Sequence, residues 1–368
     1  MNASNIDNKP RVAKETKNKI RVEFERTPLK ERLKARFATM SFLKKVVWFI
    51  FRFVLLIGVS YVVIMPFIKM VTRSFMDVQD FLDPTVWYIP KHYTLDIYKS
   101  IITDLQYFKA FFNTFLLSSM CAIIQTFFCC LIAYGLAKFK FKGNKFIFLA
   151  VIFTMVVPHE VLRSTLDEHF REFDIFGIFQ LLGGGGITIF GHNIPVAIDI
   201  FPDSLSHIFT TNGIYLKNTF WPLVLLSITG LAFKNGLYIF LLRQFFRGVP
   251  DELEESAYID GSNTFRTFLQ IILPLSVPMM ITVFLFAFSW QWTDNFYTNV
   301  FFANQKVWLM PNVIGVPGSL TVPTQVESNY TEAVYGAAGV LIILPLVLIY
   351  LFGQRYIVQG IERSGITG

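Results

Sequence analysis

Several short motifs with which enzymes bind phosphate or zinc, or position a nucleophile, are absent from this chain or only partly present. The four glycines at 183–186 are not followed by the Gly-Lys-Ser/Thr of a phosphate-binding loop, and that pattern occurs nowhere else. His159-Glu160 lacks the second His that completes a zinc-binding helix, and the five His residues are scattered. No Gly-x-Ser-x-Gly nucleophile motif stands out. The sequence therefore predicts no catalytic residue, no metal site and no ATP hydrolysis through a phosphate-binding loop.

Residues 250–261 carry the most informative pattern, because both ends of a short helix are marked. Pro250 suits the first helical position, and Gly261 suits the residue just past the helix end. Carboxylates favour the first turn, where the helix dipole is positive; here they are Asp251, Glu252 and Glu254. The pattern predicts an acidic helix of about ten residues. It is either an ordinary surface helix or a docking element for a partner protein. In the second case, the small side chains of Ser256 and Ala257 would let the partner's backbone approach closely.

The composition places this helix in a membrane protein. The 368-residue chain is 53% hydrophobic and only 16% charged, whereas soluble domains carry about 25% charged residues. A spanning helix needs about 20 mostly apolar residues. Six stretches qualify, namely 46–70, 111–139, 146–162, 220–246, 268–290 and 333–352. We therefore expect an all-α membrane protein with six transmembrane helices.

The basic residues orient these spans. Residues 1–45 hold 13 Lys and Arg against five acids, and the loop 138–145 holds four Lys. More Arg residues lie between the fourth and fifth spans and in the tail: Arg243, Arg247, Arg266, Arg355 and Arg363. Six spans place all of these on one side, and short loops rich in Lys and Arg are cytoplasmic. The sequence thus predicts a multi-pass protein of the cell membrane with both termini in the cytoplasm.

The predicted docking helix has the spacing of a known motif. Glu255-Ser256-Ala257 is followed by three residues, Gly261, nine residues and then Ile271-Ile272-Leu273-Pro274. This resembles the cytoplasmic loop of binding-protein-dependent ABC importer permeases, in which Glu-Ala-Ala opens the motif. The stretches 241–247, 290–295 and 354–360 resemble maltose-type carbohydrate permeases. The resemblance runs from Leu43 to Gly368 and is to the six-span, second permease of that group; Ser256 in place of the first Ala is a small-for-small departure.

The resemblance implies the type I importer permease fold and a set of partners. These are a second homologous permease, two ABC ATPase subunits that bind the ATP and Mg, and an extracellular or lipid-anchored substrate-binding protein. The chain itself would bind no cofactor. Its ATPase-coupling residues would be Glu255, Ser256, Ala257, Asp260, Gly261, Ile271, Leu273 and Pro274. Import of a sugar or oligosaccharide is the expected function; the alternatives are a permease for another solute, such as a peptide or an osmolyte, and a stand-alone secondary transporter or channel.

Lys234 is the charged residue least expected in its surroundings. It lies about halfway along 220–246, and a Lys at the bilayer centre costs roughly 2.5–3.5 kcal/mol on insertion scales. Either it faces the translocation path or an acid of the partner permease, or a helix break places it near water without a substrate role. Polar and aromatic residues that suit sugar faces complete the candidate path: Lys234, Asn235, Asn113, Gln125, Trp290, Trp292 and Asp294.

These expectations divide the chain into four parts. Residues 1–45 form a basic cytoplasmic arm, which we expect to face lipid headgroups and not nucleic acid, because an apolar span follows it directly. Residues 46–110 form the first span and an outer loop, 111–355 the permease domain with its cytoplasmic coupling loop 247–266, and 356–368 a cytoplasmic tail. Residues of roughly 170–214 form an outer insertion that the resembling permeases lack, with the glycines at 183–186 as a flexible bend and the external binding protein as a possible contact.

Overall fold

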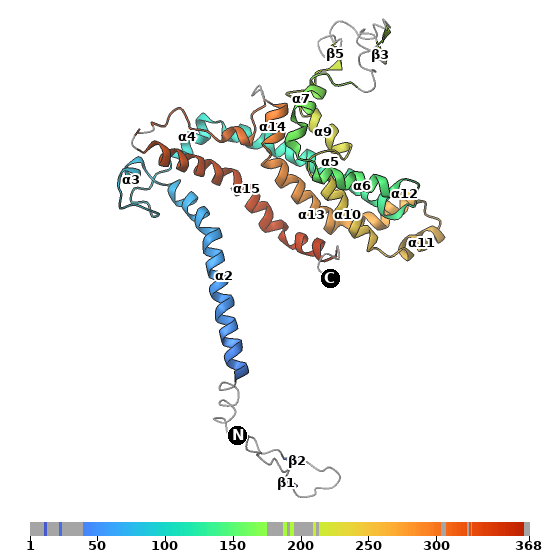
Figure 1. The fold of residues 1–368 in the computed structure, drawn as a ribbon, viewed down its shortest axis with the longest axis horizontal. Coiled ribbons are helices and arrows are strands. Elements are labelled where there is room, and N and C mark those ends of the chain that lie inside the picture. Colours follow the sequence, from blue (N-terminus) through green and yellow to red (C-terminus); the bar gives the residue numbers. More distant parts are fainter. Residues whose placement is uncertain are drawn as a thin grey trace. The chain divides into compact units, whose positions relative to one another are not determined.

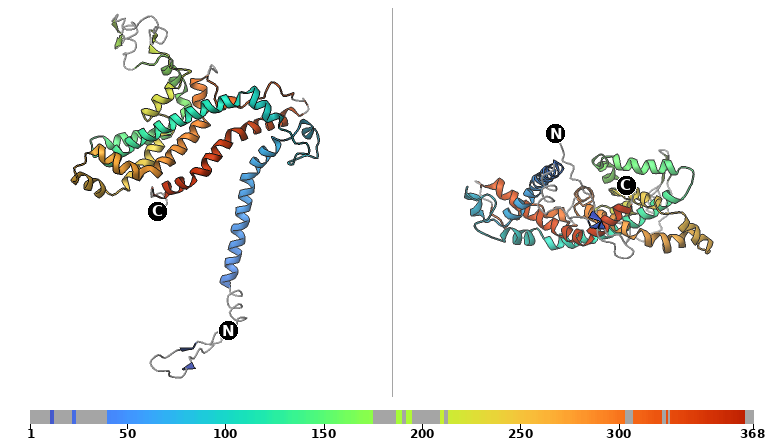
Figure 2. Two further views of the ribbon diagram at one scale, coloured as in Figure 1. Left: turned by 180° about the vertical axis from the view of Figure 1, so that it is seen from behind. Right: turned by 90° about the horizontal axis from the view of Figure 1, so that it is seen from below.

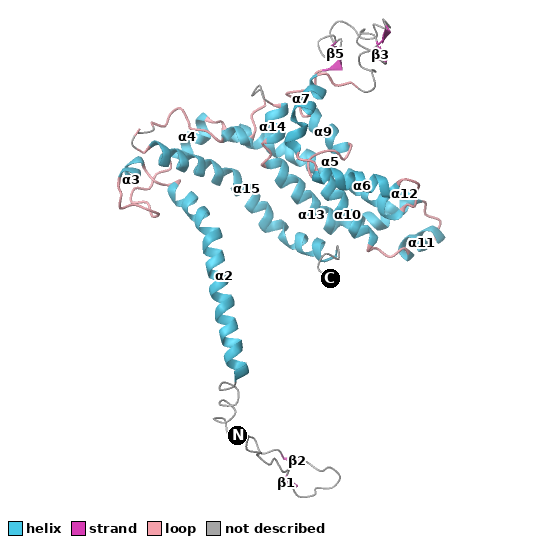
Figure 3. Cartoon of the chain, viewed as in Figure 1, coloured by secondary structure: helices cyan, strands magenta, loops and turns pink. Residues whose placement is uncertain are grey.

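A computed structural model gives the fold of residues 40–174, 213–302, 307–321, 324 and 326–363, with short strands at 11–12, 22–23, 187–189, 192–194 and 209–210. Most of the basic arm, the glycines at 183–186 and the last five residues lie outside this part of the chain. Residues 1–69 and 70–368 form two compact units. The described residues are mainly helical (Figure 3).

The described strands form three short antiparallel pairs. They are β1 (Arg11–Val12) with β2 (Val22–Glu23), β3 (Ile187–Ile189) with β4 (His192–Ile194), and β5 (Phe209–Thr210) with β6 (Gly213–Ile214). Four of the six strands fall in or next to the expected outer insertion. The expected all-α fold class of the membrane region is therefore confirmed.

Helix α2 (Met40–Arg73) contains the first expected span and makes up most of the described part of the first unit. Its apolar side chains are exposed on all sides of the helix, including Val47, Val54 and Val62 at 60–71%. A helix that is apolar all round is stable only where lipid or protein surrounds it. This helix is therefore long and apolar enough to cross a bilayer.

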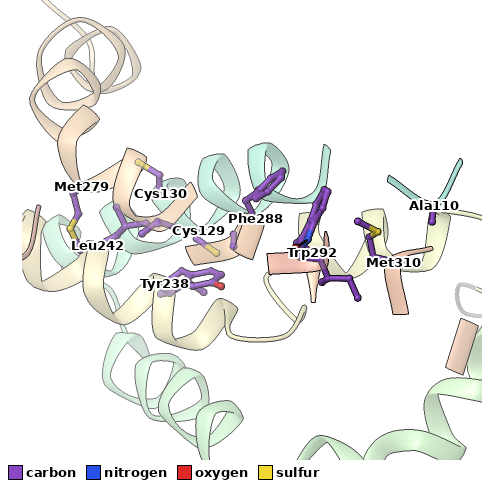
Figure 4. Packing of buried hydrophobic residues seen from close by; sticks show 14 of the residues in the cluster. Ala110, Cys129, Cys130, Tyr238, Leu242, Met279, Phe288, Trp292 and Met310 are labelled. Atoms are coloured by element: carbon purple, nitrogen blue, oxygen red, sulfur yellow. Dashed lines mark hydrogen bonds between the residues drawn. The ribbon is translucent and has the colours of Figure 1, made fainter. Parts of the chain in front are cut away.

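Four helices form the packed body of the second unit. They are α5 (Tyr107–Lys138), α10 (Asn235–Arg247), α13 (Leu273–Trp292) and α15 (Glu327–Arg363). Helix α5 packs against both α10 and α13, and α13 packs against α15 (Figures 1 and 2). Cys129 and Cys130 of α5, Tyr238 of α10 and Phe288 of α13 meet in one buried cluster (Figure 4). The three cysteines are free and buried, as small packing residues should be.

Glycines bring α15 close to α13. A Cβ on Gly353 would lie 2.5 Å from a methyl of Leu285, and one on Gly360 would lie 3.3 Å from the carbonyl oxygen of Pro278. The hydroxyl of Thr282 donates a hydrogen bond to the Tyr356 carbonyl across the same interface, at 3.1 Å. Without a hydrophobic driving force in lipid, such close packing and interhelical hydrogen bonds hold spans together.

Two of the expected spans are broken. Helix α6 (Asn144–Val156) stops before Pro158, and the chain turns by 97° into η1 (His159–Leu162) and α7 (Arg163–Arg171). The fourth stretch forms α9 (Trp221–Ile228) and α10, with left-handed backbone at Gly230 and Lys234 between them. Within the described residues, four helices are long enough to cross a membrane, and the α6–α7 pair makes a bent fifth. With the shorter α10, this is consistent with six spans.

The remaining helices lie at the ends of the long ones. α12 (Thr264–Thr267) continues through a π-helical turn, η3 (Phe268–Ile272), into α13, so the fifth expected span is one helix from Thr264 to Trp292. The π turn ends two residues before Pro274, which has no N–H for the helical ladder. The others are α3 (Val78–Leu82), α4 (Asp96–Asp104), α11 (Glu252–Ile259), α14 (Phe296–Phe301) and η4 (Met310–Val313).

Candidate functional site

Helix α11 forms where the acidic pattern predicts it and ends as predicted. Gly261 follows the C-cap residue Asp260 with φ +81°, a left-handed conformation that favours glycine. Its N–H donates to the Tyr258 carbonyl at 3.0 Å, and the Ser262 N–H donates to the Ala257 carbonyl at 2.9 Å. These two bonds make a Schellman motif, which satisfies carbonyls that the helix end would leave free.

The start of α11 differs from the prediction. Pro250 precedes the N-cap residue Asp251, so it is not the first helical residue, and the helix has eight residues where about ten were expected. The side chain of Asp251 accepts no hydrogen bond from a following N–H of the helix. Its carboxylate is instead drawn to a lysine of another helix.

That lysine is Lys138, the last residue of α5, and it clasps the start of α11. Its ammonium donates to the Val249 carbonyl at 2.7 Å and to the Asp251 carboxylate at 2.5 Å, and lies 3.5 Å from a carboxylate oxygen of Glu254. The hydrogen bond from Lys138 holds the pKa of Asp251 below its usual value. Only 7% of the Lys138 side chain and 9% of the Glu254 side chain is exposed, so the second pair is screened little by solvent.

Tyr134, one turn before Lys138, completes the clasp. Its hydroxyl donates to Glu254 at 3.3 Å, and its ring lies 4.8 Å from that of Phe268 in the π turn and 5.6 Å from that of Phe246 in α10. The clasp, defined as Tyr134, Lys138, Asp251 and Glu254, therefore connects α11 to three of the long helices. Sequence reasoning used Lys138 only to orient the membrane and missed this role. The available signal was the spacing of Glu254 and Ala257, which three residues apart share one face of α11.

The predicted coupling residues lie on two different sides of this element. Glu255, Ser256, Asp260 and Gly261 are exposed, whereas Ala257 is buried together with Glu254. Farther along, Ile271 and Leu273 are half-buried around the π turn and Pro274 is exposed. The motif thus consists of a surface face on α11 and a packed segment that leads into α13.

Lys234 sits at the α9–α10 break, in a left-handed conformation with φ +66°. Its ammonium lies 4.7 Å from the ring centres of both Phe233 and Trp290. These contacts border a cavity of about 480 Å³ between the end of α6, the turn into α7, the break and α14. His159 also lines this cavity, and the centre of its ring lies 3.5 Å from the centre of the Phe233 ring. The helix break that the sequence offered as one explanation of Lys234 is present and ends at Lys234, whereas Asn235 and Gly236 are the first residues of α10.

Three other candidate path residues meet beside Lys234. Gln125, Trp290 and Asp294 line a second, small cavity that shares Phe233 and Tyr297 with the first. The Gln125 amide donates to the Ser227 hydroxyl at 3.2 Å. The Asp294 carboxylate accepts from the N–H groups of Tyr297 and Thr298 at 2.9 and 3.2 Å, which caps α14. Burial raises the pKa of Asp294 to about 6.

The last three candidates lie apart from these cavities. Trp292 is fully buried and its indole N–H donates to the Ile342 carbonyl at 3.0 Å, between α13 and α15 (Figure 4). The Asn113 amide donates to the Trp308 carbonyl at 3.0 Å. Asn235 is fully buried between α10 and α5, and its amide atoms find no partner within the described part of the chain. None of these three lines either of the two cavities described beside Lys234.

The fold and the motif define a membrane component of a transporter. The chain belongs to the family of binding-protein-dependent transport system inner membrane components, whose model matches residues 127–363. This confirms the resemblance to importer permeases and makes the chain a multi-pass transport subunit without an ATPase site of its own.

Sequence relatives and a solved structure agree with this class. The chain is 26% identical to the alpha-glucoside transport system permease protein AglG of Rhizobium meliloti (strain 1021), over 76% of this chain and 62% of AglG, less than two thirds of that relative. It is 24% identical to the polygalacturonan/rhamnogalacturonan transport system permease protein YtcP of Bacillus subtilis (strain 168), over 83% of this chain and 93% of the relative. A chain in the crystal structure of a bacterial ABC transporter involved in the import of the acidic polysaccharide alginate has the same fold, with a TM-score of 0.58, 19% identity, and coverage of 85% and 97%.

Proposed function

We propose that this chain is a permease subunit of an ATP-driven importer that moves a sugar or oligosaccharide, delivered by an external binding protein, across the cell membrane. Carbohydrate relatives such as AglG and YtcP support the substrate class. The proposed partners are a second homologous permease, two ATPase subunits that hold ATP and Mg, and the binding protein. Both termini would lie in the cytoplasm, because loops rich in Lys and Arg stay on the cytoplasmic side of the membrane.

The observation that carries this proposal is the two-sided construction of α11. Its inner face is fixed by the clasp, while Ile259 on the outer face is 86% exposed and Tyr258 is 40% exposed. Apolar side chains left exposed on an acidic surface helix indicate a protein contact. Glu255 to Gly261 would dock on the ATPase, and movement of α11 would pass to α5 through Lys138 and to α13 through the π turn.

The cavities at the α9–α10 break are the proposed part of the translocation path. Lys234, Trp290, Gln125 and Asp294 line or border them, and the break supplies the irregular backbone that membrane transporters place at solute sites. Alternating access would open this region to one side of the membrane at a time as the ATPases close.

The test is to purify the tagged chain in mild detergent, identify its partners by mass spectrometry, and measure uptake in proteoliposomes of the assembly. Recovery of a second permease and an ATPase, with saccharide uptake that requires ATP, is the expected result. Recovery of the chain alone as a stable homo-oligomer that transports without ATP would instead support a secondary transporter or channel. ATP-dependent uptake of a peptide or an osmolyte, and of no sugar, would overturn the substrate class.

A further inference from the structure

The cavity beside the α9–α10 break holds an ammonium group that no carboxylate neutralises. Within the described residues, Lys234 makes no ion pair, and no Asp or Glu lines the 480 Å³ cavity. Glu160, the acid that follows His159 in the chain, is paired with Arg163 at 3.0 Å. A cation in partly dry surroundings is stabilised strongly by an anion that enters them.

The ammonium lies against two neighbouring aromatic rings. The ring centres of Phe233 and Trp290 are 5.5 Å apart, and each lies 4.7 Å from the ammonium, which is within the range of cation–π attraction. The backbone of Lys234 is left-handed, one of three non-glycine residues with positive φ in the described part of the chain. Backbone strain of this kind persists where the surrounding structure holds the residue in one conformation. Strained residues are concentrated at ligand sites.

The wall of the same cavity supplies groups that suit a sugar ring. His159 offers a ring nitrogen for a hydroxyl group, and Phe296 and Tyr297 offer aromatic rings. The Asp294 carboxylate makes no ion pair with Lys234 within the described residues, and it accepts from the N–H groups at the start of α14. An ammonium beside aromatic rings and a polar side chain matches a saccharide that carries a carboxylate.

We propose that the 480 Å³ cavity forms a subsite for an acidic sugar, in which Lys234 binds the carboxylate of a uronic acid residue and the aromatic rings of Phe296 and Tyr297 border its ring. This inference rests on the proposed function and narrows its substrate class to oligosaccharides that contain uronic acids. It also assigns Lys234 a substrate role, in place of a pairing with an acid of the partner permease.

The experiment measures binding directly, in the complete assembly held in lipid nanodiscs, by saturation-transfer NMR. The probe is digalacturonate, and the matched ligand is its methyl ester, which has the same rings and hydroxyls without the charge. We expect saturation transfer to digalacturonate in the wild type and in Lys234→Arg, and a loss of affinity of about tenfold or more in Lys234→Met, because a hydrogen bond to a charged group is removed. The ester should bind weakly to all three proteins, and empty nanodiscs give the background.

Two results would overturn the subsite. One is equal binding of digalacturonate by the wild type and Lys234→Met, or equal binding of acid and ester by the wild type. The other is loss of the second permease from the Lys234→Met assembly alone, which would assign Lys234 to an ion pair between subunits. ATP-dependent uptake, measured in parallel on proteoliposomes, separates the two proposals. Uptake of neutral saccharides with no preference for uronates would contradict the subsite only. Absence of ATP-dependent uptake of any saccharide would contradict the proposed function.

Discussion

At the scale of single residues, Gly261 is restricted by its backbone and not by its neighbours. No atom lies within 4 Å of the position that a Cβ would take, but φ is +81°. A β-branched residue in this conformation costs about 1–2 kcal/mol, whereas Asn tolerates it. The Schellman motif at the end of α11 therefore depends on the residue type at this one position.

Gly261→Val should loosen the end of α11 and reduce saccharide uptake per ATP hydrolysed, because the surface proposed to meet the ATPase loses its shape. Gly261→Asn is the matched control and should stay close to the wild type. ATPase activity and uptake measured on the same proteoliposomes give the ratio. Unchanged coupling in Gly261→Val would argue that α11 does not transmit the ATPase movement.

Asp294 should make stability depend on pH near neutrality. Its pKa of about 6 in the folded state lies above the ordinary 3.8, so the folded protein binds a proton that the unfolded chain has lost. The stabilisation is therefore present at low pH and is lost as pH rises through about 6, by about 2–3 kcal/mol in total. Asp294→Asn keeps an oxygen acceptor for the α14 N–H groups but cannot ionise.

The check is thermal unfolding in detergent at pH 5 and pH 8. The wild type should lose more stability than Asp294→Asn between these two values, and the two proteins should be most alike at pH 5. A difference between the two proteins that does not change with pH would show that Asp294 stays ionised in the folded protein.

At the scale of elements, α11 is joined to α5 by a buried ion pair and to α10 and α13 by aromatic contacts of Tyr134. Removing one partner of such a pair leaves the other charge buried and unpaired, at about 3–5 kcal/mol. We therefore expect the clasp to hold α11 against the long helices through the transport cycle.

Lys138→Met should detach the start of α11 and lower uptake per ATP, and it should speed amide hydrogen exchange across residues 251–260. Lys142→Met, a change of an exposed lysine in the next loop, is the matched control. Adding Glu254→Gln to Lys138→Met should restore part of the protection, because the buried charge is gone. Equal exchange rates in Lys138→Met and Lys142→Met would contradict the clasp.

The contact of α10 with α6 depends on Gly236. A Cβ at this position would lie 2.6 Å from the Thr154 hydroxyl oxygen and 2.9 Å from the Val151 carbonyl oxygen, and backbone atoms cannot rotate away. Gly236→Leu should destabilise the protein by about 1–3 kcal/mol through overpacking, measured as the unfolding temperature in detergent. Gly318→Leu, where a Cβ meets nothing within 4 Å, should be nearly neutral; similar losses in both variants would contradict the packing argument.

At the scale of the whole molecule, the polar loops divide into two sets by charge. The Lys-rich loop 138–145 lies at one end of α5, and the segment of α3 and α4, with buried Asp80 and half-buried Asp83, precedes the other end. Their placement on opposite sides of the membrane is the expectation that fixes the direction of transport.

Cysteine labelling in intact cells tests that orientation. A Cys at Tyr93, which is 72% exposed, should react with a membrane-impermeant maleimide from outside, and a Cys at Lys142 should react only after the membrane is opened. The three native cysteines are buried and should give little background. Labelling of the Lys142 position from outside would reverse the proposed topology.

The sequence by itself determined the features that depend on local chemistry. Apolar runs of spanning length predict α2, α5, α13 and α15, because lipid requires long stretches without charge. Pro250, the acidic first turn and Gly261 predict α11, since capping acts within a few residues. The motif spacing led to the family that the comparison over residues 127–363 confirms.

Only the tertiary structure decided which distant residues meet. The sequence did not place Lys138 next to Glu254, although each lies near the end of a predictable helix, because their separation of 116 positions is closed by helix packing. It gave Trp290 and Trp292 the same candidate role, but α13 turns Trp290 toward Lys234 and Trp292 into the core. Two positions along a helix differ by about 200° around its axis, so their roles are assigned by the helices that pack on each side.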